Sequence, residues 1–273
     1  MSHRWSHPVR LFATAGLALL VAQTMLPVGA AAVDPAAIQV RAAAPRAKPL
    51  KPNLVALKAG DLHIQRTSRG RFIRFESGLG NVGRGPIEVR PNRRRDCPRG
   101  QHHATQVMYR DVDGSRYYRR NVDTEVARRS AGCMVFHPAH NHWHFRASAR
   151  YALFQPEKER PIRVARRKMS FCLRDTDRIP ASYGTFHQRE RYGACSKSSP
   201  QGISVGWVDI YQSFLAGQAL RLPARARDGL YCLRTKVDPT DQLVETDNGD
   251  NTSLRAFTLT GDRIRYRKSS RCT

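Results

Sequence analysis

Short apolar runs, each interrupted after a few residues by Gly, Pro or Asp, dominate the chain from residue 53 onward. Within these runs apolar and polar side chains alternate, which is typical of β-strands with one buried face. The runs that predict strands are residues 72–75, 87–89, 106–110, 116–119, 150–154, 170–173, 230–237, 254–258 and 263–267. Asp113-Gly114 separates two of these runs, and this turn dipeptide predicts a β-hairpin.

Helical periodicity is weak by comparison and is confined to residues 206–220, and no segment repeats elsewhere in the chain. The chain has 273 residues, which is long enough to bury a sizeable core in one large domain. The pattern therefore predicts a mainly β fold, organised as a single β-sandwich-like domain with long loops and few short helices over residues 53–273.

The N-terminal residues follow a different pattern. Arg4 and Arg10 precede an apolar run at residues 11–26, and small residues follow at 28–32. This is the layout of a cleavable secretory signal, and the apolar run is shorter than the roughly 20 residues that span a bilayer. We assign residues 1–32 to a Sec-type signal peptide and the Ala/Pro-rich residues 33–52 to a flexible linker. The prediction is a secreted, extracellular protein without stable membrane insertion.

Six cysteines follow the predicted signal, and export would place them in an oxidising compartment, where cysteines pair as disulfides. They are Cys97, Cys133, Cys172, Cys195, Cys232 and Cys272. Neither C-x-x-C pairs nor zinc-ribbon spacing occurs among them, so we do not expect a thiolate metal site. Their spacing alone does not choose among the many connectivities that six cysteines permit.

The formal net charge is +25 at pH 7, from 47 Lys and Arg against 22 Asp and Glu. Arginine is scattered through every segment and no nucleic-acid-binding signature accompanies it, so we expect no nucleic-acid partner. The interleaved basic and aromatic residues 109–120 are interpreted as the two faces of a hairpin. Attraction to an anionic cell-wall or extracellular polymer is one meaning of the charge, and a solvated arginine-rich surface is another.

Four of the ten histidines fall between residues 137 and 144. Residues two apart in a strand point to the same face, so His140, His142 and His144 can direct three imidazoles at one ion if the strand bends. Neutral imidazoles suit copper, zinc or nickel and leave further positions open for water or oxygen. His137 is out of phase with this alternation, so we expect it beside the ligands rather than among them.

The stretch His140-Asn141-His142-Trp143-His144 resembles the copper motif of the lysyl oxidase family, and further segments resemble that family in the same order. They are Lys168-Met169-Ser170-Phe171-Cys172-Leu173-Arg174-Asp175-Thr176, the segment Gln201-Gly202-Ile203-Ser204 with Gly206, Asp209 and Tyr211, and Pro239 with Glu245-Thr246-Asp247-Asn248-Gly249-Asp250-Asn251. Together they make residues 53–272 similar to the catalytic domain of a bacterial-type member.

This resemblance implies a copper-dependent amine oxidase in which His140, His142 and His144 hold the copper. Lys168 and Tyr211 would form a lysine tyrosylquinone, a cofactor that the protein builds from itself. The implied reaction converts a primary amine, on peptidyl lysine or a small molecule, to an aldehyde, and molecular oxygen is reduced to hydrogen peroxide as ammonia is released. Asp209 is our candidate for the base that removes a proton, and a hydrogen-bonded loop carboxylate is the alternative interpretation.

The acidic run near the C-terminus suggests a second ion, because clustered carboxylate and amide oxygens on a Gly-containing loop suit calcium. The resemblance implies ligands at Asn53, Glu245, Asp247, Asp250 and Asn251, with the Leu54 carbonyl beside them. A turn without metal is the alternative. The resemblance also implies a disulfide between Cys172 and Cys195, and for the other cysteines we pair Cys97 with Cys133 and Cys232 with Cys272.

The chain departs from the family at Pro138, Ala139 and Trp207, which stand where animal catalytic domains have cysteines. Two other functions stay open. One is a secreted copper-binding module of the cell envelope that never forms the quinone. The other is a zinc hydrolase, disfavoured because no glutamate is near the histidines in sequence, although Glu88 and Glu125 can approach in space. A basic oxidase also repels ammonium substrates, unless acidic sequences flank the target lysine.

Overall fold

The computed structural model describes residues 48–93, 96–156 and 165–272, and the predicted signal peptide and most of the predicted linker lie outside this part of the chain. Within it, long antiparallel strands alternate with irregular loops, and the helices are three 3-10 turns, η2 (Pro138–His140), η3 (Ala181–Tyr183) and η4 (Ser269–Cys272). The predicted mainly β fold is confirmed. The described residues hold no helix of the length and apolarity that crossing a membrane requires.

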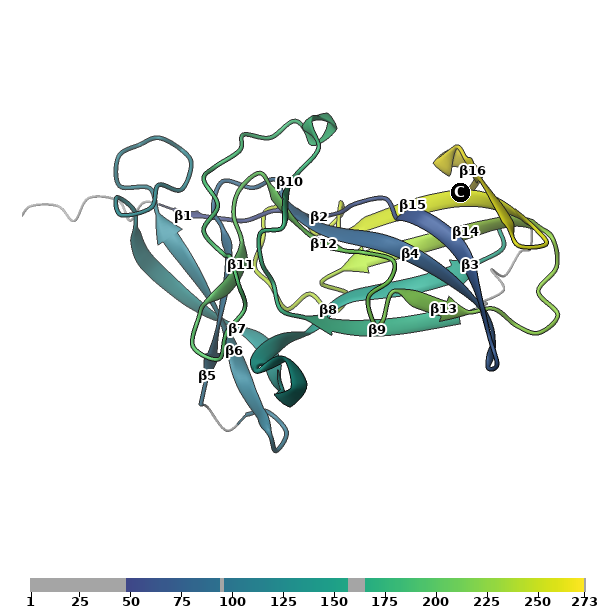
Figure 1. Cartoon of the computed structure of the whole chain (residues 1–273). Helices are drawn as coiled ribbons and strands as arrows, with labels where there is room; N and C mark the ends of the chain where they lie inside the picture. Colours follow the sequence, from purple (N-terminus) through teal and green to yellow (C-terminus); the bar gives the residue numbers. More distant parts are fainter. Residues whose placement is uncertain (1–47, 94–95, 157–164, 273) are drawn as a thin grey trace, which may run out of the picture. The chain divides into compact units, whose positions relative to one another are not determined.

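The larger sheet has the strand order β11-β5-β6-β7-β8-β14-β15-β16, and β1 and β9 pair with β6 and β8 beside this path. Its strands are β1 (Pro49–Leu50), β5 (Ile87–Asn92), β6 (Gln101–Arg110), β7 (Thr124–His137), β8 (His142–Phe154), β9 (Ala165–Phe171), β11 (Gln201–Ile203), β14 (Gly229–Val237), β15 (Thr252–Thr260) and β16 (Arg263–Arg267). Neighbouring strands are joined by short turns at β7–β8 and β15–β16 and by long loops elsewhere (Figure 1).

The smaller sheet is organised around one long strand, β4 (Gly70–Asn81), which pairs with four others. Those partners are β2 (Leu54–Ala56), β3 (Gly60–Thr67), β12 (Trp207–Tyr211) and β13 (Ala219–Arg221), while β10 (Asp177–Arg178) extends the sheet beyond β12. The β12–β4 pairing matters most for function, because it fixes Asp209 opposite Leu79 and Tyr211 opposite Ser77.

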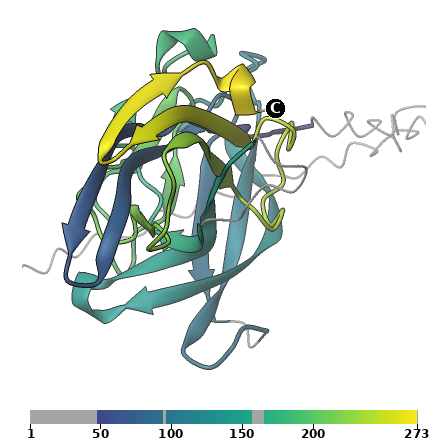
Figure 2. The same cartoon turned by 90° about the vertical axis from the view of Figure 1, so that its right-hand side faces the viewer.

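Figure 2 gives a second view of the strands of both sheets. The two sheets share one hydrophobic core. Phe75 of β4 meets Tyr151 of β8 edge to face at 4.8 Å, and both side chains are fully buried. The Tyr151 hydroxyl is satisfied by Ser77 Oγ at 2.6 Å, so this polar group does not disrupt the core. The apolar faces read from the sequence therefore pack against each other as a β-sandwich requires.

Most predicted strands are confirmed, but the hairpin at Asp113-Gly114 is wrong. β6 ends at Arg110 and β7 begins at Thr124, so residues 111–123 form a loop. Carboxylates organise it: the Val112 amide donates to Asp123 Oδ1 at 2.9 Å, and the Arg116 amide donates to Asp111 at 2.8 Å. Side chains of Asp compete well for nearby amides, and here they replace the strand pairing.

Two further boundaries differ from the prediction. The weak helical periodicity at residues 206–220 is not a helix, since β12 and β13 lie there and pair with β4. Part of the predicted linker is folded, since Pro49–Leu50 form β1 on the edge of β6. Leu50 is buried with Tyr109 and Tyr118, and this apolar contact holds the segment in place.

Candidate active site

The histidine turn, residues 137–144, joins β7 to β8 and brings four imidazoles together. β7 ends at His137, which pairs with His142 at the start of β8. Between them η2 turns the chain, and Asn141 adopts a left-handed conformation with φ of 53°. His140 thus comes from the turn rather than from a bent strand, while His142 and His144 share one face of β8 as alternation predicts.

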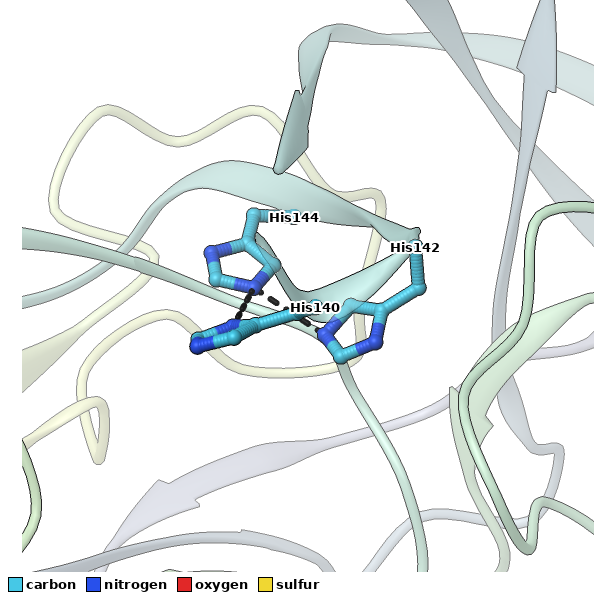
Figure 3. A group of neighbouring side chains, drawn as sticks. All are labelled: His140, His142 and His144. Carbon is cyan, nitrogen blue, oxygen red and sulfur yellow. Dashed lines mark hydrogen bonds between the residues drawn. The ribbon is translucent and has the colours of Figure 1, made fainter. Parts of the chain in front are cut away.

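The three predicted ligands face one another across a short gap (Figure 3). His144 Nε2 lies 3.4 Å from His140 Nδ1 and 3.1 Å from His142 Nε2. Metal–nitrogen bonds of about 2.0–2.1 Å would place these pairs at roughly 100–110° around one ion. The nitrogens therefore fit a single metal without large movement, and the exposed His140 leaves the solvent side of the site open.

Burial keeps these imidazoles in the neutral form that binds a metal. Burial and, after it, the neighbouring histidines lower the pKa of His144 to about 4. The same two causes lower the pKa of His142. Both rings are therefore neutral at neutral pH, which is the protonation state that binds a metal.

His137 lies beside this group, as predicted. Its ring stacks on His140 at 4.0 Å and on His144 at 5.0 Å. Its Nδ1 is buried and has no hydrogen-bond partner among the described residues. The stacking limits how the ligand rings can rotate, so His137 supports their orientation.

Three contacts of Trp143, in the histidine turn, were not foreseen from the sequence. His102 of β6 stacks on Trp143 at 4.1 Å, and Gln201 donates through Nε2 to the Trp143 carbonyl at 2.5 Å. The Trp143 indole also donates to the Lys197 carbonyl at 3.2 Å. Since Trp143 separates two ligands, these contacts fix the strand that carries both. Gln201 belongs to a segment that resembles the family, but His102 had no sequence signal.

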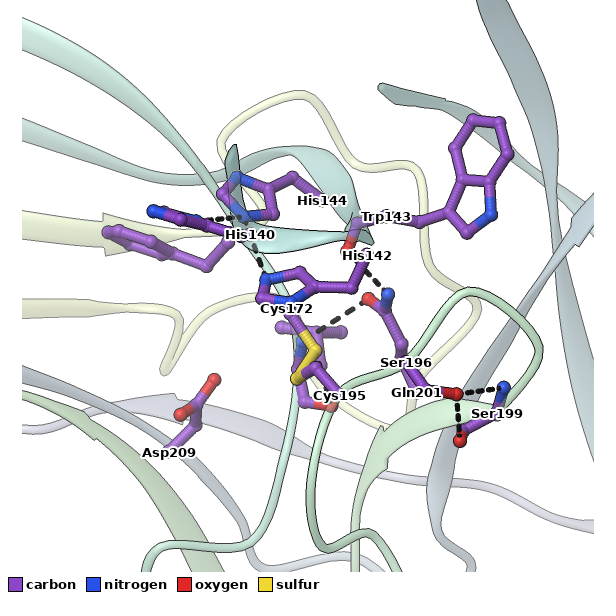
Figure 4. The surroundings of a disulfide bond; sticks show 12 residues. His140, His142, Trp143, His144, Cys172, Cys195, Ser196, Ser199, Gln201 and Asp209 are labelled. Carbon is purple, nitrogen blue, oxygen red and sulfur yellow. Dashed lines mark hydrogen bonds between the residues drawn. A yellow bond between two sulfur atoms is a disulfide. The ribbon is translucent and has the colours of Figure 1, made fainter. Parts of the chain in front are cut away.

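The Cys172–Cys195 disulfide connects the histidines to the predicted cofactor tyrosine (Figure 4). A ring nitrogen of His142 lies within 4.8 Å of both sulfurs, and the Tyr211 hydroxyl donates to the Cys172 carbonyl at 2.7 Å. Figure 4 shows the three histidines and Asp209 around this bridge. The other two disulfides join Cys97 to Cys133 and Cys232 to Cys272, so the expected pairing is confirmed throughout.

The buried Asp209 and the half-buried Tyr211 form a hydrogen-bonded pair at the end of β12. The Tyr211 hydroxyl donates to Asp209 Oδ2 at 2.6 Å, and the Tyr211 ring stacks on Phe171 at 3.6 Å. Burial raises the pKa of Asp209 to about 8 and the pKa of Tyr211 well above its ordinary value. A phenol has one hydrogen, so its contacts with Asp209 and with Cys172 are both full hydrogen bonds only when Asp209 is protonated. The raised pKa favours that state at neutral pH.

Lys168 lies in β9, where its backbone pairs with Arg150 of β8. Its side chain lies outside the described part of the structure, so the predicted contact with Tyr211 stays a prediction. Phe171, three residues further along β9, is the residue that stacks on Tyr211.

The acidic loop, residues 245–251, closes on the first residues of the domain. Leu54 donates its amide to Glu245 Oε2 at 2.7 Å, and Asn53 Nδ2 donates to Asp250 Oδ2 at 2.8 Å. Asn251 Nδ2 donates to Glu245 Oε1, also at 2.7 Å. Asp250 Oδ1 and Asn251 Oδ1 are buried with no hydrogen-bond partner among the described residues. Such unsatisfied oxygens fit a hard cation.

The raised pKa values in the acidic loop also fit a bound cation, which would stabilise the ionised carboxylates. Burial raises the pKa of Glu245 to about 7, and it raises the pKa of Asp250 as well. Asp247 is exposed; its Oδ1 accepts the Gly249 amide at 2.7 Å, and its own amide donates to Asn53 Oδ1 at 2.8 Å. The structure therefore groups Asn53, Glu245, Asp250 and Asn251 and leaves Asp247 more exposed.

The zinc hydrolase alternative required a glutamate beside the histidines. Glu88 is buried, and it accepts hydrogen bonds from Tyr109 at 2.8 Å and Tyr192 at 2.6 Å and pairs with Arg191 at 3.1 Å. Glu125 pairs with Arg90 at 3.4 Å. In the described parts of the chain no carboxylate joins the ligand groups that contain these histidines. Among the described residues, Glu88 and Glu125 have partners elsewhere, so the zinc hydrolase is not favoured.

Comparison with known proteins agrees with this geometry. The family model described as lysyl oxidase matches residues 116–269, which is more than half of the 273-residue chain. The match includes the histidine turn, β9, β12 and the acidic loop. A search of curated proteins gives no match.

Proposed function

The chain belongs to the lysyl oxidase family, and from this we propose that it is a copper-dependent amine oxidase. Its substrates would be primary amines, on lysine side chains or small molecules, and its products an aldehyde, hydrogen peroxide and ammonia. The observation that carries the proposal is that the three histidines lie near the Tyr211–Asp209 pair. A ring nitrogen of His142 lies within 4.8 Å of both sulfurs of the Cys172–Cys195 disulfide, and Tyr211, the partner of Asp209, donates to the Cys172 carbonyl.

The residues present fit the groups that the family implies. His140, His142 and His144 would hold copper through nitrogens that are 3.1–3.4 Å apart. Copper would supply redox chemistry with oxygen, and a lysine tyrosylquinone made from Lys168 and Tyr211 would supply the carbonyl that reacts with an amine. We also propose calcium at Asn53, Glu245, Asp250 and Asn251, where two buried oxygens lack partners among described residues.

The chain's own residues fix the Tyr211 ring and hold a proton on Asp209. Stacking on Phe171 and the hydrogen bonds of the hydroxyl with Asp209 and the Cys172 carbonyl restrict the Tyr211 ring. Asp209 is only 1% exposed, so a proton on Oδ2 exchanges with Tyr211 rather than with bulk water. A carboxyl with a pKa near 8 accepts protons readily once it is ionised, which suits a base in a slightly alkaline medium.

Amine-dependent peroxide release tests the proposal directly. The mature protein, loaded with copper in air, is expected to release peroxide with a small primary amine and to show a visible absorption band. Tyr211→Phe and Lys168→Arg are expected to keep copper but lose both the band and the peroxide, whereas His142→Ala loses copper first. Copper-loaded wild type with the band but without peroxide would refute oxidase activity.

The alternative, a copper-binding module without a quinone, has one observation in its favour. The Tyr211 phenol is satisfied by two hydrogen bonds and covered by Phe171, so unmodified tyrosine fits this place. Intact mass separates the two functions, because only the oxidase contains a crosslink between Lys168 and Tyr211. We further propose a secreted protein, which the three disulfides favour.

A further inference from the structure

A pocket of about 620 Å³ lies outside the candidate active site. One wall comes from the β6–β7 loop, at residues 115–121, and the other from residues 186–191. None of its lining residues belongs to the histidine turn, to the Tyr211–Asp209 pair or to the acidic loop. The proposed oxidase chemistry therefore leaves this pocket unexplained.

Backbone hydrogen bonds hold the walls of the pocket in place. The Tyr118 amide donates to the Arg84 carbonyl at 2.8 Å, and the Gln188 amide donates to the Val205 carbonyl at 2.9 Å. The Gln188 side chain joins the walls by donating to the Tyr118 carbonyl. A pocket that is already formed avoids much of the ordering cost of binding.

The lining carries an excess of positive charge. Four arginines line the pocket against one carboxylate, that of Glu190. Arg119 and Arg191 have carboxylate partners in Asp113 and Glu88. Arg120 and Arg189 are exposed, and within the described residues neither has an ion-pair partner. Two guanidinium groups are thus free to bind an anion, which they can do through two parallel hydrogen bonds each.

An exposed aromatic pair adds an apolar subsite. Tyr117 is 36% exposed and Phe186 is 56% exposed, and their rings lie 5.4 Å apart across the two walls. Exposed aromatic side chains next to arginines are typical of recognition surfaces. The pocket therefore offers an anion-binding part and an apolar part side by side.

We propose that this pocket binds an acidic segment of the protein substrate. Arg120 and Arg189 would bind its carboxylates, and the Tyr117–Phe186 pair would bind an adjacent apolar side chain. The proposal rests on the proposed amine oxidase function and specifies its substrate. A chain with a net charge of +25 repels an ammonium group, and acidic residues near the target lysine reverse that repulsion.

The position of the pocket allows one peptide to reach both sites. The Trp207 indole donates to the Gln188 carbonyl at 2.7 Å, which ties the pocket wall to the start of β12. Tyr211 stands four residues further along this strand. Four residues of strand span about 13 Å, a distance that about four residues of extended peptide cover.

Binding is tested with a fluorescent peptide that has Asp and Glu beside Phe but no lysine. Fluorescence anisotropy is measured on the mature protein, so no turnover is needed. We expect the double variant Arg120→Glu/Arg189→Glu to weaken binding by about tenfold or more, and Phe186→Ala by about threefold. The matched control is Arg263→Glu/Arg265→Glu, which makes the same change in net charge on exposed β16 residues outside the pocket. It is expected to weaken binding less than about twofold.

Equal weakening by the control pair would overturn the proposal, because it would show general attraction to a basic surface. Equal binding of a peptide with Gln and Asn in place of the acids would overturn it as well, and so would an absence of peptide binding. Unchanged unfolding midpoints of the variants show that they are folded.

A kinetic experiment tests whether the pocket contributes to turnover of a peptide substrate. With a peptide that joins the acidic segment to a lysine, the pocket variants are expected to raise KM about tenfold, while their turnover of a small primary amine stays at the wild-type value. Equal KM in wild type and variants would overturn the substrate role. If neither the wild type nor any variant oxidises an amine, the proposed function is wrong. The anisotropy experiment then decides by itself whether the pocket binds an acidic peptide.

Discussion

The histidine turn and the acidic loop are both candidate metal sites, but burial acts on their ligands in opposite directions. In the histidine turn it lowers the pKa of His142 and His144, so the rings are neutral and ready to bind a metal. In the acidic loop it raises the pKa of Glu245 to about 7, so at neutral pH the carboxyl retains much of its proton. Burial favours the neutral form of the side chain in both places. A neutral imidazole binds a metal, whereas a carboxyl must lose its proton first.

The two regions also differ in how they are assembled. The histidine ligands come from eight consecutive residues around one turn. The acidic loop needs Asn53, almost two hundred residues earlier in the chain, to complete its hydrogen bonds. Occupancy of the loop by a cation would therefore be coupled to folding of the whole domain, whereas copper binding is coupled to one hairpin. Four predictions test this contrast, in order of decreasing expected effect.

The first concerns Asp209, a carboxyl whose protonated form is favoured by burial. Asp209→Asn preserves the shape and the hydrogen bond but cannot accept a proton, so we expect kcat to fall by about 10²–10⁴-fold. In the wild type kcat should rise with pH through about 8, because the base is ionised above its pKa. Steady-state peroxide assays between pH 6 and 10 measure both. A variant with wild-type kcat and the same inflection would exclude Asp209 as the base.

The second compares a ligand with its neighbour in the histidine turn. His144→Ala should weaken copper binding by about 100-fold or more, because it removes a direct nitrogen ligand. His137→Ala should weaken it by about tenfold, the lower end of the range for residues that orient ligands. Competition with a chelator of known copper affinity provides the measurement. Equal losses in the two variants would make His137 a fourth ligand.

The third concerns stability in the acidic loop. Without metal, Glu245 binds a proton more tightly in the folded than in the unfolded state, so between pH 4.5 and about 7 its contribution to stability is lost as pH rises. We expect a loss of about 2–3 kcal/mol from this group in the wild type and none in Glu245→Gln. Urea unfolding at pH 5 and pH 8 in a chelator gives the difference, with the exposed carboxyl variant Glu190→Gln as control. A wild-type loss equal to that of Glu245→Gln would contradict the assignment.

The fourth compares the pH dependence of the two ions. Calcium must displace the Glu245 proton, so calcium affinity should fall about tenfold per pH unit below 7. Copper affinity should change little with the protonation of His144 between pH 6 and 8, because that ring is already neutral. Calorimetric titrations of each ion at pH 6, 7 and 8 make the comparison. Parallel pH dependences would show that burial does not distinguish the two regions.

Much of the candidate site follows from short stretches of sequence. Alternation in β8 places His142 and His144 on one face whatever the rest of the fold does, and two imidazoles on one face can bind the same metal. The strand runs were also predictable, because alternation with turn residues is a local property. The predicted hairpin at Asp113-Gly114 is wrong because Asp111 and Asp123 accept hydrogen bonds from loop amides. The alternation of apolar and polar residues does not reveal such competition for the backbone.

Tertiary structure decided what the residues can do chemically. The sequence singled out Asp209 and Tyr211, but only the pairing of β12 with β4 and the packing of Phe171 bury them, and burial sets the pKa values. In the same way, the basic and aromatic residues 109–120 stand out in the sequence, but nothing there connects them with residues 186–191, about seventy residues away, which form the other wall of the pocket. The sequence by itself determined the strands, the histidine spacing and the family. Long-range packing decided the protonation states, the grouping of the acidic loop with Asn53 and the existence of the pocket, because each depends on contacts between segments that are distant along the chain.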